Sequence, residues 1–203
     1  MAFIETSTEA YSLEQHCVFF RTKEQWGGFS NMCGGFPLKV GDVDIRSSEA
    51  LYQALRYPHL PQAQAEILAE KSPMGSKFAS KRYTPLTRPD WDRARVQAMC
   101  YALTVKVSCH FDAMAALFEE TGDRQIVERS RKDPFWGAIL NESTGVLTGQ
   151  NILGKLLMLF RRDIAKRGKE FRRANAPEGS LLLGVPIEPF PPRDLQEERI
   201  PIP

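Results

Sequence analysis

The sequence predicts one α+β domain that is predominantly helical, with a small antiparallel sheet or hairpin near the N-terminus. Strand-like apolar patterns are confined to about the first 45 residues, and segments with helical apolar spacing follow them as far as residue 167. A chain of 203 residues with 42% hydrophobic content is long enough to bury one core without disulfide or metal staples.

The strand signals lie at the start of the chain. Residues 17–21, with the sequence CVFFR, have the composition of a short strand. Residues 36–45 alternate around a Val-Gly-Asp turn, which favours a hairpin.

Three kinds of signal indicate the helices: serines that can cap a helix, a proline suited to a first turn, and apolar positions at helical spacing. The expected helices cover residues 47–57, 61–71, 89–109, 112–123 (stopped by Gly122) and 150–167. Residues 133–149 have no such spacing, so an irregular segment is expected there.

The composition divides the chain into a domain over residues 1–173 and an extended, Pro-rich tail over residues 174–203. The tail has two alternatives: it is disordered, or its apolar residues, such as Leu181, Val185 and Phe190, pack over the domain or against a partner.

The charge balance excludes several classes of protein. A formal net charge of +2 is too small for a strongly basic nucleic-acid binder, and no apolar run has membrane-spanning length. The first ten residues lack the pattern of a secretory signal, so we expect a cytoplasmic protein.

The four cysteines and three histidines show no metal-ligand spacing, which predicts free thiols and no metal.

Glu49, Tyr52, Gln53 and Arg56 follow i, i+3, i+4, i+7 spacing on one face of the expected helix 47–57. Such a face can line a nucleotide cleft, where the carboxylate stabilises an oxocarbenium ion or activates water. The alternative is structural, because an acidic residue in a first helical turn complements the helix dipole.

Six other segments carry candidate binding residues. In GGFSNM, Phe29 can stack on a base while Ser30 and Asn31 bond ribose or phosphate, or the segment is an ordinary turn. Arg95 and Lys106 can face a shared anion beside Trp91, and Lys77 and Lys81 can bind phosphate. The alternative is that these cations are solvated.

The last three segments follow residue 130. Asp133, Trp136 and Gly137 place an acid beside an indole of the kind found in nucleotide clefts, or Trp136 is an isolated buried residue. Asn151 and Gly154 lie at a helix start that can receive an anion, unless they serve capping and close packing. The basic run 161–173 is either a nucleic-acid contact or a solvated helix end.

Six blocks in order resemble the NADAR (YbiA-like) family across about residues 17–167. They are GGFSNM, SSEALYQALR, SPMGSKFASKR, DWDRARVQAM, TGDRQIVERSRKDPFWG and GQNILGKLLMLFR. Glu49 and Gln53 match the family pattern. Ala50 replaces its usual histidine, Arg56 its usual lysine, and Ser80-Lys81 a common Gly-Arg pair.

The resemblance implies a YbiA-like single domain and an N-glycosyl hydrolase of the ADP-ribosylglycohydrolase type, without metal or cofactor. The preferred expectation is removal of ADP-ribose from guanine in DNA or nucleotides, acting as antitoxin to a partner ADP-ribosyltransferase. The alternatives are hydrolysis of ribosylamino-pyrimidine intermediates of riboflavin synthesis, a non-catalytic ADP-ribose or NAD sensor, and a nucleic-acid scaffold built on the basic run.

The resemblance and the residue patterns together define the candidate site. Its catalytic candidates are Glu49, Lys77 and Asp133, with Lys77 as a nucleophile able to form a Schiff base with the ribose carbon. Its substrate-binding candidates are Phe29, Ser30, Asn31, Tyr52, Gln53, Trp91, Arg95, Lys106, Trp136, Gly137, Asn151 and Gly154.

Overall fold

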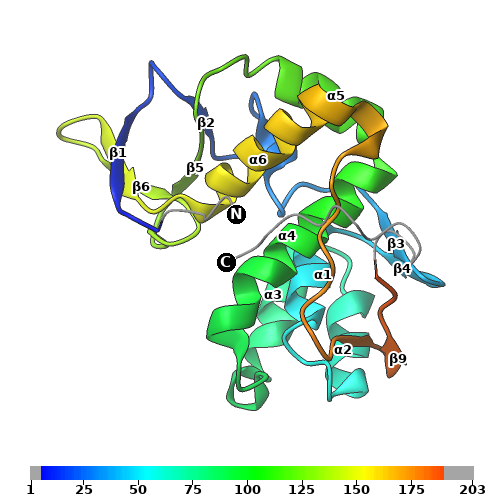
Figure 1. The fold of residues 1–203 in the computed structure, drawn as a ribbon. Helices are drawn as coiled ribbons and strands as arrows, with labels where there is room; N and C mark the ends of the chain where they lie inside the picture. The colour runs from blue at the N-terminus through cyan, green and yellow to red at the C-terminus, as the bar shows by residue number, and fades with distance from the viewer. Residues whose placement is uncertain (1–5, 190–203) are drawn as a thin grey trace. The chain divides into compact units, whose positions relative to one another are not determined.

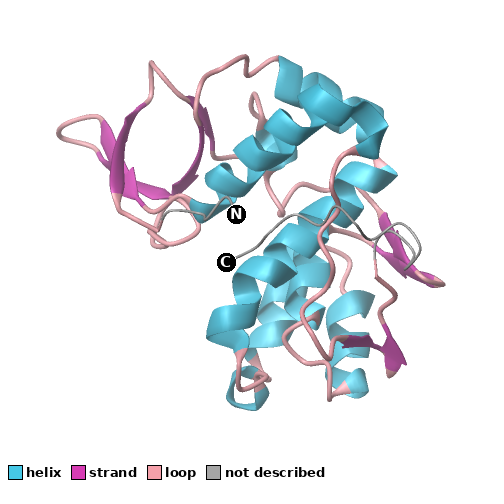
Figure 2. Cartoon of the chain, in the orientation of Figure 1, coloured by secondary structure: helices cyan, strands magenta, loops and turns pink. Residues whose placement is uncertain are grey.

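The computed structural model describes residues 6–189, which divide into two compact units. The first unit contains residues 6–30 and 111–171, and the second contains residues 31–110 and 172–189. Figure 1 traces the chain, and Figure 2 shows helices and strands in both units. The fold is therefore mixed α/β, which corrects the expectation of a predominantly helical domain.

A curled five-stranded sheet belongs to the first unit (Figure 1). Its strands are β1 (Glu9–Ser12), β2 (Cys17–Phe19), β5 (Ile126–Ser130), β6 (Ala138–Asn141) and β7 (Val146–Gly149), in the order β1-β7-β6-β5-β2. The pairs β2–β5 and β5–β6 are parallel, whereas β6–β7 and β1–β7 are antiparallel. The sheet is therefore mixed and takes three of its strands from residues 126–149.

The expectation of an irregular segment over residues 133–149 was wrong, because β6 and β7 lie within it. Each strand of this region contributes little to the core: the buried cluster consists of Tyr11, Val127, Ala138 and Leu147, one residue from each of four strands. Burial alternates along β7 but not along β6. Strands β6 and β7 form a local antiparallel pair, whereas β7 and β5 also pair with β1 and β2 from the distant start of the chain.

The helices of the first unit pack on this sheet and on each other. They are α5 (Phe111–Glu119) and α6 (Ile152–Arg167), with 3₁₀ turns η1 (Gly27–Phe29) and η3 (Gly168–Glu170). Helix α6 packs against β5 and α5. Gly122 follows α5 and Gly168 follows α6, both with positive φ, which only glycine adopts without strain.

The second unit contains most of the helices. They are α1 (Ser48–Ala54), α2 (Pro61–Ala69), α3 (Pro73–Lys81), the 3₁₀ turn η2 (Thr84–Leu86) and α4 (Trp91–Cys109). Ser47 caps α1 by accepting from the Ala50 N–H at 3.2 Å, and Ser72 caps α3 in the same way. Pro61 occupies the first turn of α2, as expected from its fixed φ.

Helix α4 is more deeply buried than its apolar stripe indicated. All residues from position 98 to position 107 are buried, on every side of the helix. The first turns near Trp91 and the last two residues of the helix, Ser108 and Cys109, are partly or fully exposed. A polar residue between positions 98 and 107 therefore has to be accommodated in the interior.

Residues 36–45, where the sequence favoured a hairpin, contain the antiparallel pair β3 (Leu38–Val40) and β4 (Val43–Ile45). Leu38 lies opposite Ile45, and both side chains are buried. This pair is separate from the five-stranded sheet. The principal sheet is thus not the small N-terminal one that we expected.

The described part of the tail packs over the second unit. The Ala174 N–H donates to the Thr104 hydroxyl at 3.0 Å, and the Gln64 amide bonds the backbone of the short strand β8 (Leu181–Leu182) at 2.8 Å. The chain then turns into β9 (Val185–Pro186). Phe190 and the rest of the tail, like residues 1–5, lie outside the described residues.

Candidate functional site

Glu49 lies in the first turn of α1, but it is not a surface residue. Its side chain is only 5% exposed, and every residue of α1 is buried. A carboxylate that merely complements the helix dipole would be solvated. Burial of this carboxyl group therefore requires partners, which several neighbouring side chains supply.

Gln53, one turn along α1, holds Glu49 directly. Its Nε2 donates to Oε1 of Glu49 at 2.9 Å. Its own Oε1 accepts from the Ser80 hydroxyl at 2.6 Å and from the Arg56 guanidinium at 3.4 Å. Because these two neighbours donate to the amide oxygen, the amide nitrogen is the atom that faces Glu49.

Tyr57 extends this chain of hydrogen bonds into the interior. Its hydroxyl donates to the Ser80 carbonyl oxygen at 2.8 Å and lies 3.2 Å from the Ser80 Oγ. Both residues are fully buried. The orientation of Gln53 is therefore set by groups that solvent does not reach.

Burial raises the pKa of the Glu49 carboxyl group above its usual value. The hydrogen bond from Gln53 and the charges of Lys77 and Arg56 act in the opposite direction but do not cancel the effect of burial. The group can thus carry a proton at a higher pH than an ordinary glutamate. This property suits a residue that gives up and recovers a proton during catalysis.

Two aromatic side chains, Tyr52 and Trp91, lie beside the Glu49–Gln53 pair. The rings of Tyr52 and Trp91 lie 5.3 Å apart between centroids. The Arg56 guanidinium lies 5.4 Å from the Trp91 ring and donates to the Thr87 hydroxyl at 3.1 Å. Arg56 therefore connects the aromatic pair with the amide of Gln53.

Lys77 lies on α3, the helix that also supplies Ser80. Its side chain is exposed, and its charge acts on the Glu49 carboxyl group. Helices α1 and α3 pack closely. The candidate nucleophile and the candidate acid therefore belong to adjacent helices of one unit.

The structure corrects the expected role of Lys106. Its side chain is fully buried, and its ammonium group lies 4.5 Å from the centre of the Phe36 ring. Burial lowers the pKa of Lys106 to about 8. It does not face an accessible anion, because α4 is buried on all sides at this position. Arg95, nearer the start of α4, is half-buried.

Asn31 is also buried in the second unit. Its Nδ2 lies 2.7 Å from the Met99 sulfur, while its Oδ1 has no hydrogen-bond partner among residues 6–189. An unsatisfied buried oxygen is costly and often marks a place where a ligand donor or water belongs. Asn31 therefore remains a candidate binding residue.

The structure also corrects the role of Phe29. Its side chain is fully buried in the first unit, with its ring 6.0 Å from Phe19 and 5.0 Å from Phe118. A ring enclosed by two others has no face free for a base. Ser30, which follows it, is 5% exposed.

Asp133 organises a turn in the first unit. Its Oδ1 accepts from the N–H groups of Phe135 and Trp136, each at 3.0 Å. Trp136 is half-buried and packs edge to face on Phe135. Gly137 is required by close packing, because a Cβ there would collide with the Glu128 carbonyl oxygen.

Asn151 and Gly154 do not form an anion site, which corrects a further expectation. The Ile152 and Leu153 N–H groups at the start of α6 already donate to the carbonyl groups of Phe135 and Trp136, each at 3.0 Å.

The buried Asn151 side chain instead bonds β5, accepting from the Glu128 N–H and donating to the Ile126 carbonyl oxygen. A Cβ at Gly154 would collide with that same carbonyl group. Both residues therefore hold α6 against the sheet.

The candidates are thus divided between the units. The second unit brings together Glu49, Tyr52, Gln53, Lys77 and Trp91 and also holds Asn31, Arg95 and Lys106. The first unit holds Phe29, Ser30, Asp133, Trp136, Gly137, Asn151 and Gly154. Sequence reasoning missed Ser80 as a partner of Gln53 and Tyr57 as a partner of Ser80, and no local signal could have found Ser80, which lies 27 positions from Gln53.

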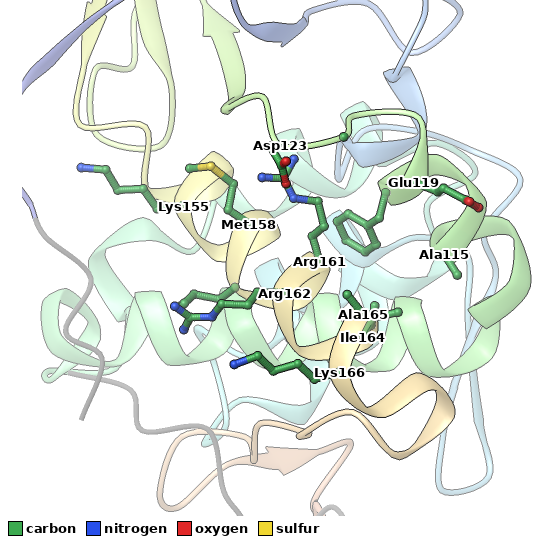
Figure 3. A pocket seen from close by; sticks show the side chains of 13 residues that line it. Ala115, Glu119, Asp123, Lys155, Met158, Arg161, Arg162, Ile164, Ala165 and Lys166 are labelled. Carbon is green, nitrogen blue, oxygen red and sulfur yellow. The ribbon is translucent and has the colours of Figure 1, made fainter.

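A separate cavity of about 950 Å³ lies in the first unit, along α5 and α6. Apolar side chains such as Phe118, Met158 and Leu159 line it, together with several basic side chains. Figure 3 shows Lys155, Arg162 and Lys166 extending from α6. Arg161 is committed to internal bonds with Thr121 and the Arg124 carbonyl oxygen, so only part of the basic run 161–173 faces solvent.

Within residues 6–189, no group of three or more His, Cys, Asp or Glu residues is placed to hold a metal ion. No helix in the same range is long and apolar enough to cross a membrane. None of the four cysteines, which all lie in this range, forms a disulfide bond.

The mixed α/β fold matches a solved protein structure. The NMR structure of the E. coli protein YbiA aligns with a TM-score of 0.63 and 27% sequence identity, over 80% of this chain and 95% of that one. The fold and the buried carboxyl site therefore define a YbiA-like protein. Residues 18–165 match the NADAR domain, and the chain belongs to the NADAR family.

Two proteins of similar sequence carry functional names. N-glycosidase Npun_R5314 from Nostoc punctiforme is 31% identical over 72% of this chain and 90% of its own length. Riboflavin biosynthesis protein VVA0006 from Vibrio vulnificus is 29% identical over 75% of this chain, which covers 39% of that longer protein.

Proposed function

We propose that this protein is an N-glycosidase that hydrolyses the bond between a base amine and a ribose carbon. The observation that carries the proposal is the buried Glu49 carboxyl group, oriented by Gln53 and with its pKa raised by burial. The name of the Nostoc punctiforme protein agrees with this reaction class. The favoured substrate is guanine carrying ADP-ribose, in DNA or in nucleotides.

The proposed reaction uses Glu49 twice. In its protonated form it donates a proton to the base nitrogen as the bond to the ribose carbon breaks, and the bonding electrons leave with the base. The resulting carboxylate faces the positive charge on the ribose and then accepts a proton from the attacking water. The products are the free base amine and ribose with a hydroxyl group at the reacting carbon, and Glu49 is protonated again.

The surrounding residues have supporting roles in this proposal. Gln53 keeps the carboxyl group oriented, and the Tyr52–Trp91 pair offers an aromatic surface to a base or sugar. Lys77 contributes a positive charge near Glu49 that suits a substrate phosphate. The Asn31 Oδ1 can accept a hydrogen bond from a ribose hydroxyl group.

A second route assigns Lys77 as a nucleophile. The ribose ring opens to an imine at the base nitrogen, the Lys77 amine adds to that ribose carbon, and the base amine leaves as a Schiff base with Lys77 forms. Water then hydrolyses the Schiff base, which frees Lys77 and releases the ribose. Borohydride should then trap sugar on the wild-type protein but not on Lys77→Met. Absence of Lys77-dependent trapping would exclude this route and leave direct water attack.

The second candidate substrate is a ribosylamino-pyrimidine intermediate of riboflavin synthesis. The observation in its favour is the name of the Vibrio vulnificus protein, which shares 29% identity with this chain. Both candidate substrates contain a bond between a base amine and ribose, so the same Glu49 chemistry serves either one. The two candidate substrates differ in how the protein would recognise them and not in the reaction mechanism.

One assay distinguishes the two candidate substrates and a non-catalytic sensor. Guanine-ADP-ribosylated DNA and the ribosylamino-pyrimidine are each incubated with wild type and with Glu49→Gln, and release of ADP-ribose or of the free pyrimidine amine is followed. We expect release of ADP-ribose from the modified guanine, which would suit an antitoxin to an ADP-ribosyltransferase, and its loss in Glu49→Gln. Binding of ADP-ribose without release from either substrate would show a sensor instead of an enzyme.

A further inference from the structure

The outward surface of α3 combines Lys77 with apolar and basic side chains that have no role in the proposed reaction. Met74 is 49% exposed and Phe78 is 57% exposed, and both are large apolar residues. Lys77 and Lys81 are exposed as well. We call these four residues the α3 outer face.

Helical geometry places the four side chains together. Positions 74, 77, 78 and 81 follow i, i+3, i+4, i+7 spacing and share one side of the helix. The opposite side is buried and includes Ser76 and Ser80, the latter bonded to Gln53. The α3 outer face is therefore a continuous surface on the helix that also supports the Glu49 site.

The chemistry of this face suits a nucleotide. Helix α3 contains no acidic residue, and the Lys81 ammonium group lies 5.0 Å from the centre of the Phe78 ring. Exposed aromatic rings flanked by cations bind single-stranded nucleic acids, because each base can stack on a ring while each phosphate faces a positive charge. The Lys77 charge acts on Glu49, so the cationic surface extends to the candidate site.

We propose that the α3 outer face is a subsite for the nucleotide next to the modified guanine in single-stranded DNA. The neighbouring base stacks on Phe78, and the intervening phosphate lies against Lys81. This inference rests on the proposed function, because it assumes that the modified base reacts at Glu49. It goes further in preferring a polynucleotide to a free nucleotide, which has no neighbouring base to stack.

The test compares two substrates in Phe78→Ala. One is a single-stranded oligodeoxynucleotide with one ADP-ribosylated guanine, and the other is ADP-ribosylated guanosine monophosphate. Loss of one stacking partner should raise KM for the oligonucleotide about tenfold with little change in kcat. The kcat/KM for the mononucleotide should be unchanged. Phe78→Trp should retain the wild-type KM for the oligonucleotide.

Val185→Ala is the matched control, since Val185 is a 65% exposed apolar residue of the same unit outside α3. It should leave both substrates unaffected. Equal loss on the two substrates in Phe78→Ala, or no loss on the oligonucleotide, would overturn the subsite. Thermal unfolding of each variant shows whether an effect arises from loss of fold.

A binding measurement separates this inference from the proposed reaction. If wild type releases ADP-ribose from neither substrate, the proposed function fails, and affinity for an unmodified oligodeoxynucleotide decides the subsite. Salt-dependent binding that weakens in Phe78→Ala supports it. Equal affinity of wild type and Phe78→Ala overturns it, and tighter binding of an oligoribonucleotide of the same sequence overturns the assignment to DNA.

Discussion

The Ser80 hydroxyl donates to the Oε1 of Gln53 at 2.6 Å, and this bond directs the Gln53 nitrogen toward Glu49. Helix α3 thereby controls a carboxyl group on helix α1 through a single amide. Ser80 stands where the family resemblance has a common glycine, which cannot make this bond. The control of Glu49 through Ser80 is therefore a property of this chain.

Replacing Ser80 by alanine should release the Gln53 amide on one side. Glu49 then loses a fixed hydrogen-bond donor that favours its charged form, so the pH limb assigned to Glu49 should move to higher pH. We also expect a loss of about 1 kcal/mol in the free energy of unfolding. The pH dependence of kcat/KM and a urea titration measure the two effects.

Ser76→Ala is the matched control for Ser80→Ala. Ser76 lies one turn away on α3, is equally buried, and bonds the Ile67 carbonyl oxygen at 3.0 Å instead of Gln53. It should cost similar stability without moving the pH limb. A pH profile that moves in both variants, or in neither, would contradict the role of Ser80.

Glu49→Gln should abolish most activity and stabilise the protein at neutral pH. General acid–base catalysis contributes about 10²- to 10⁴-fold, so kcat should fall by a factor in that range. The folded-state pKa of Glu49 is raised above its ordinary value of 4.5, so the folded state holds the proton more tightly than the unfolded state. Wild type therefore loses stability as pH rises from 4.5 through the folded-state pKa.

Glutamine does not titrate, so this loss should be absent from Glu49→Gln. The difference in unfolding free energy between the two proteins should shift in favour of the variant as pH increases above 4.5. Denaturant midpoints between pH 4 and about pH 8 measure this difference. A difference that is independent of pH would show that burial does not disfavour the charged form.

Lys106→Met should stabilise the protein. The pKa of Lys106 falls from 10.5 to about 8 on folding, which corresponds to about 3 kcal/mol of penalty for the charged form. Methionine keeps much of the buried stem without the charge. At pH 7, where lysine is charged in both states, the full gain should appear in the free energy of unfolding.

The pH dependence identifies the cause of that gain. The unfolded state binds more protons than the folded state between about pH 8 and pH 10.5, so wild-type stability should rise across this range, and the variant should lack this rise. Lys39→Met, an exposed lysine of β3, is the control and should reproduce the wild-type slope. A wild-type slope in Lys106→Met would refute the assignment.

Asn151→Ala should destabilise the first unit without a specific effect on nucleotide affinity. The change removes two buried hydrogen bonds to β5 and leaves alanine at a φ of 51°. We expect a loss of about 2 to 4 kcal/mol in the free energy of unfolding. Asn151→Gly tolerates the backbone angle and separates that contribution from the loss of hydrogen bonds.

Equilibrium binding of ADP-ribose to the folded fraction of Asn151→Ala checks the second part of this prediction. An affinity within twofold of wild type agrees with a structural role. A drop of tenfold or more in a folded variant would restore the anion-binding role at the start of α6.

The sequence by itself determined five of the helices and the central pair of the candidate site, but it did not predict α3. The positions of the predicted helices follow from local causes, namely the Ser47 cap, Pro61 and the periodic apolar residues, which act within a few residues. The i, i+4 spacing of Glu49 and Gln53 likewise brings them together in any helix. The ordered family blocks then favoured a functional role for Glu49 over complementing the helix dipole.

Only the tertiary structure decided the sheet and the roles of individual polar residues. Strands β6 and β7 pair locally, but the sheet is completed by pairing of β7 with β1 and of β5 with β2, which lie far away in the sequence. The exposure of Lys106 depends on the elements that cover α4. The ability of Asn151 to bind an anion depends on the carbonyl groups that reach the start of α6. The Ser80 hydroxyl meets Gln53 only because α3 packs on α1, and such contacts across the fold are invisible to local patterns.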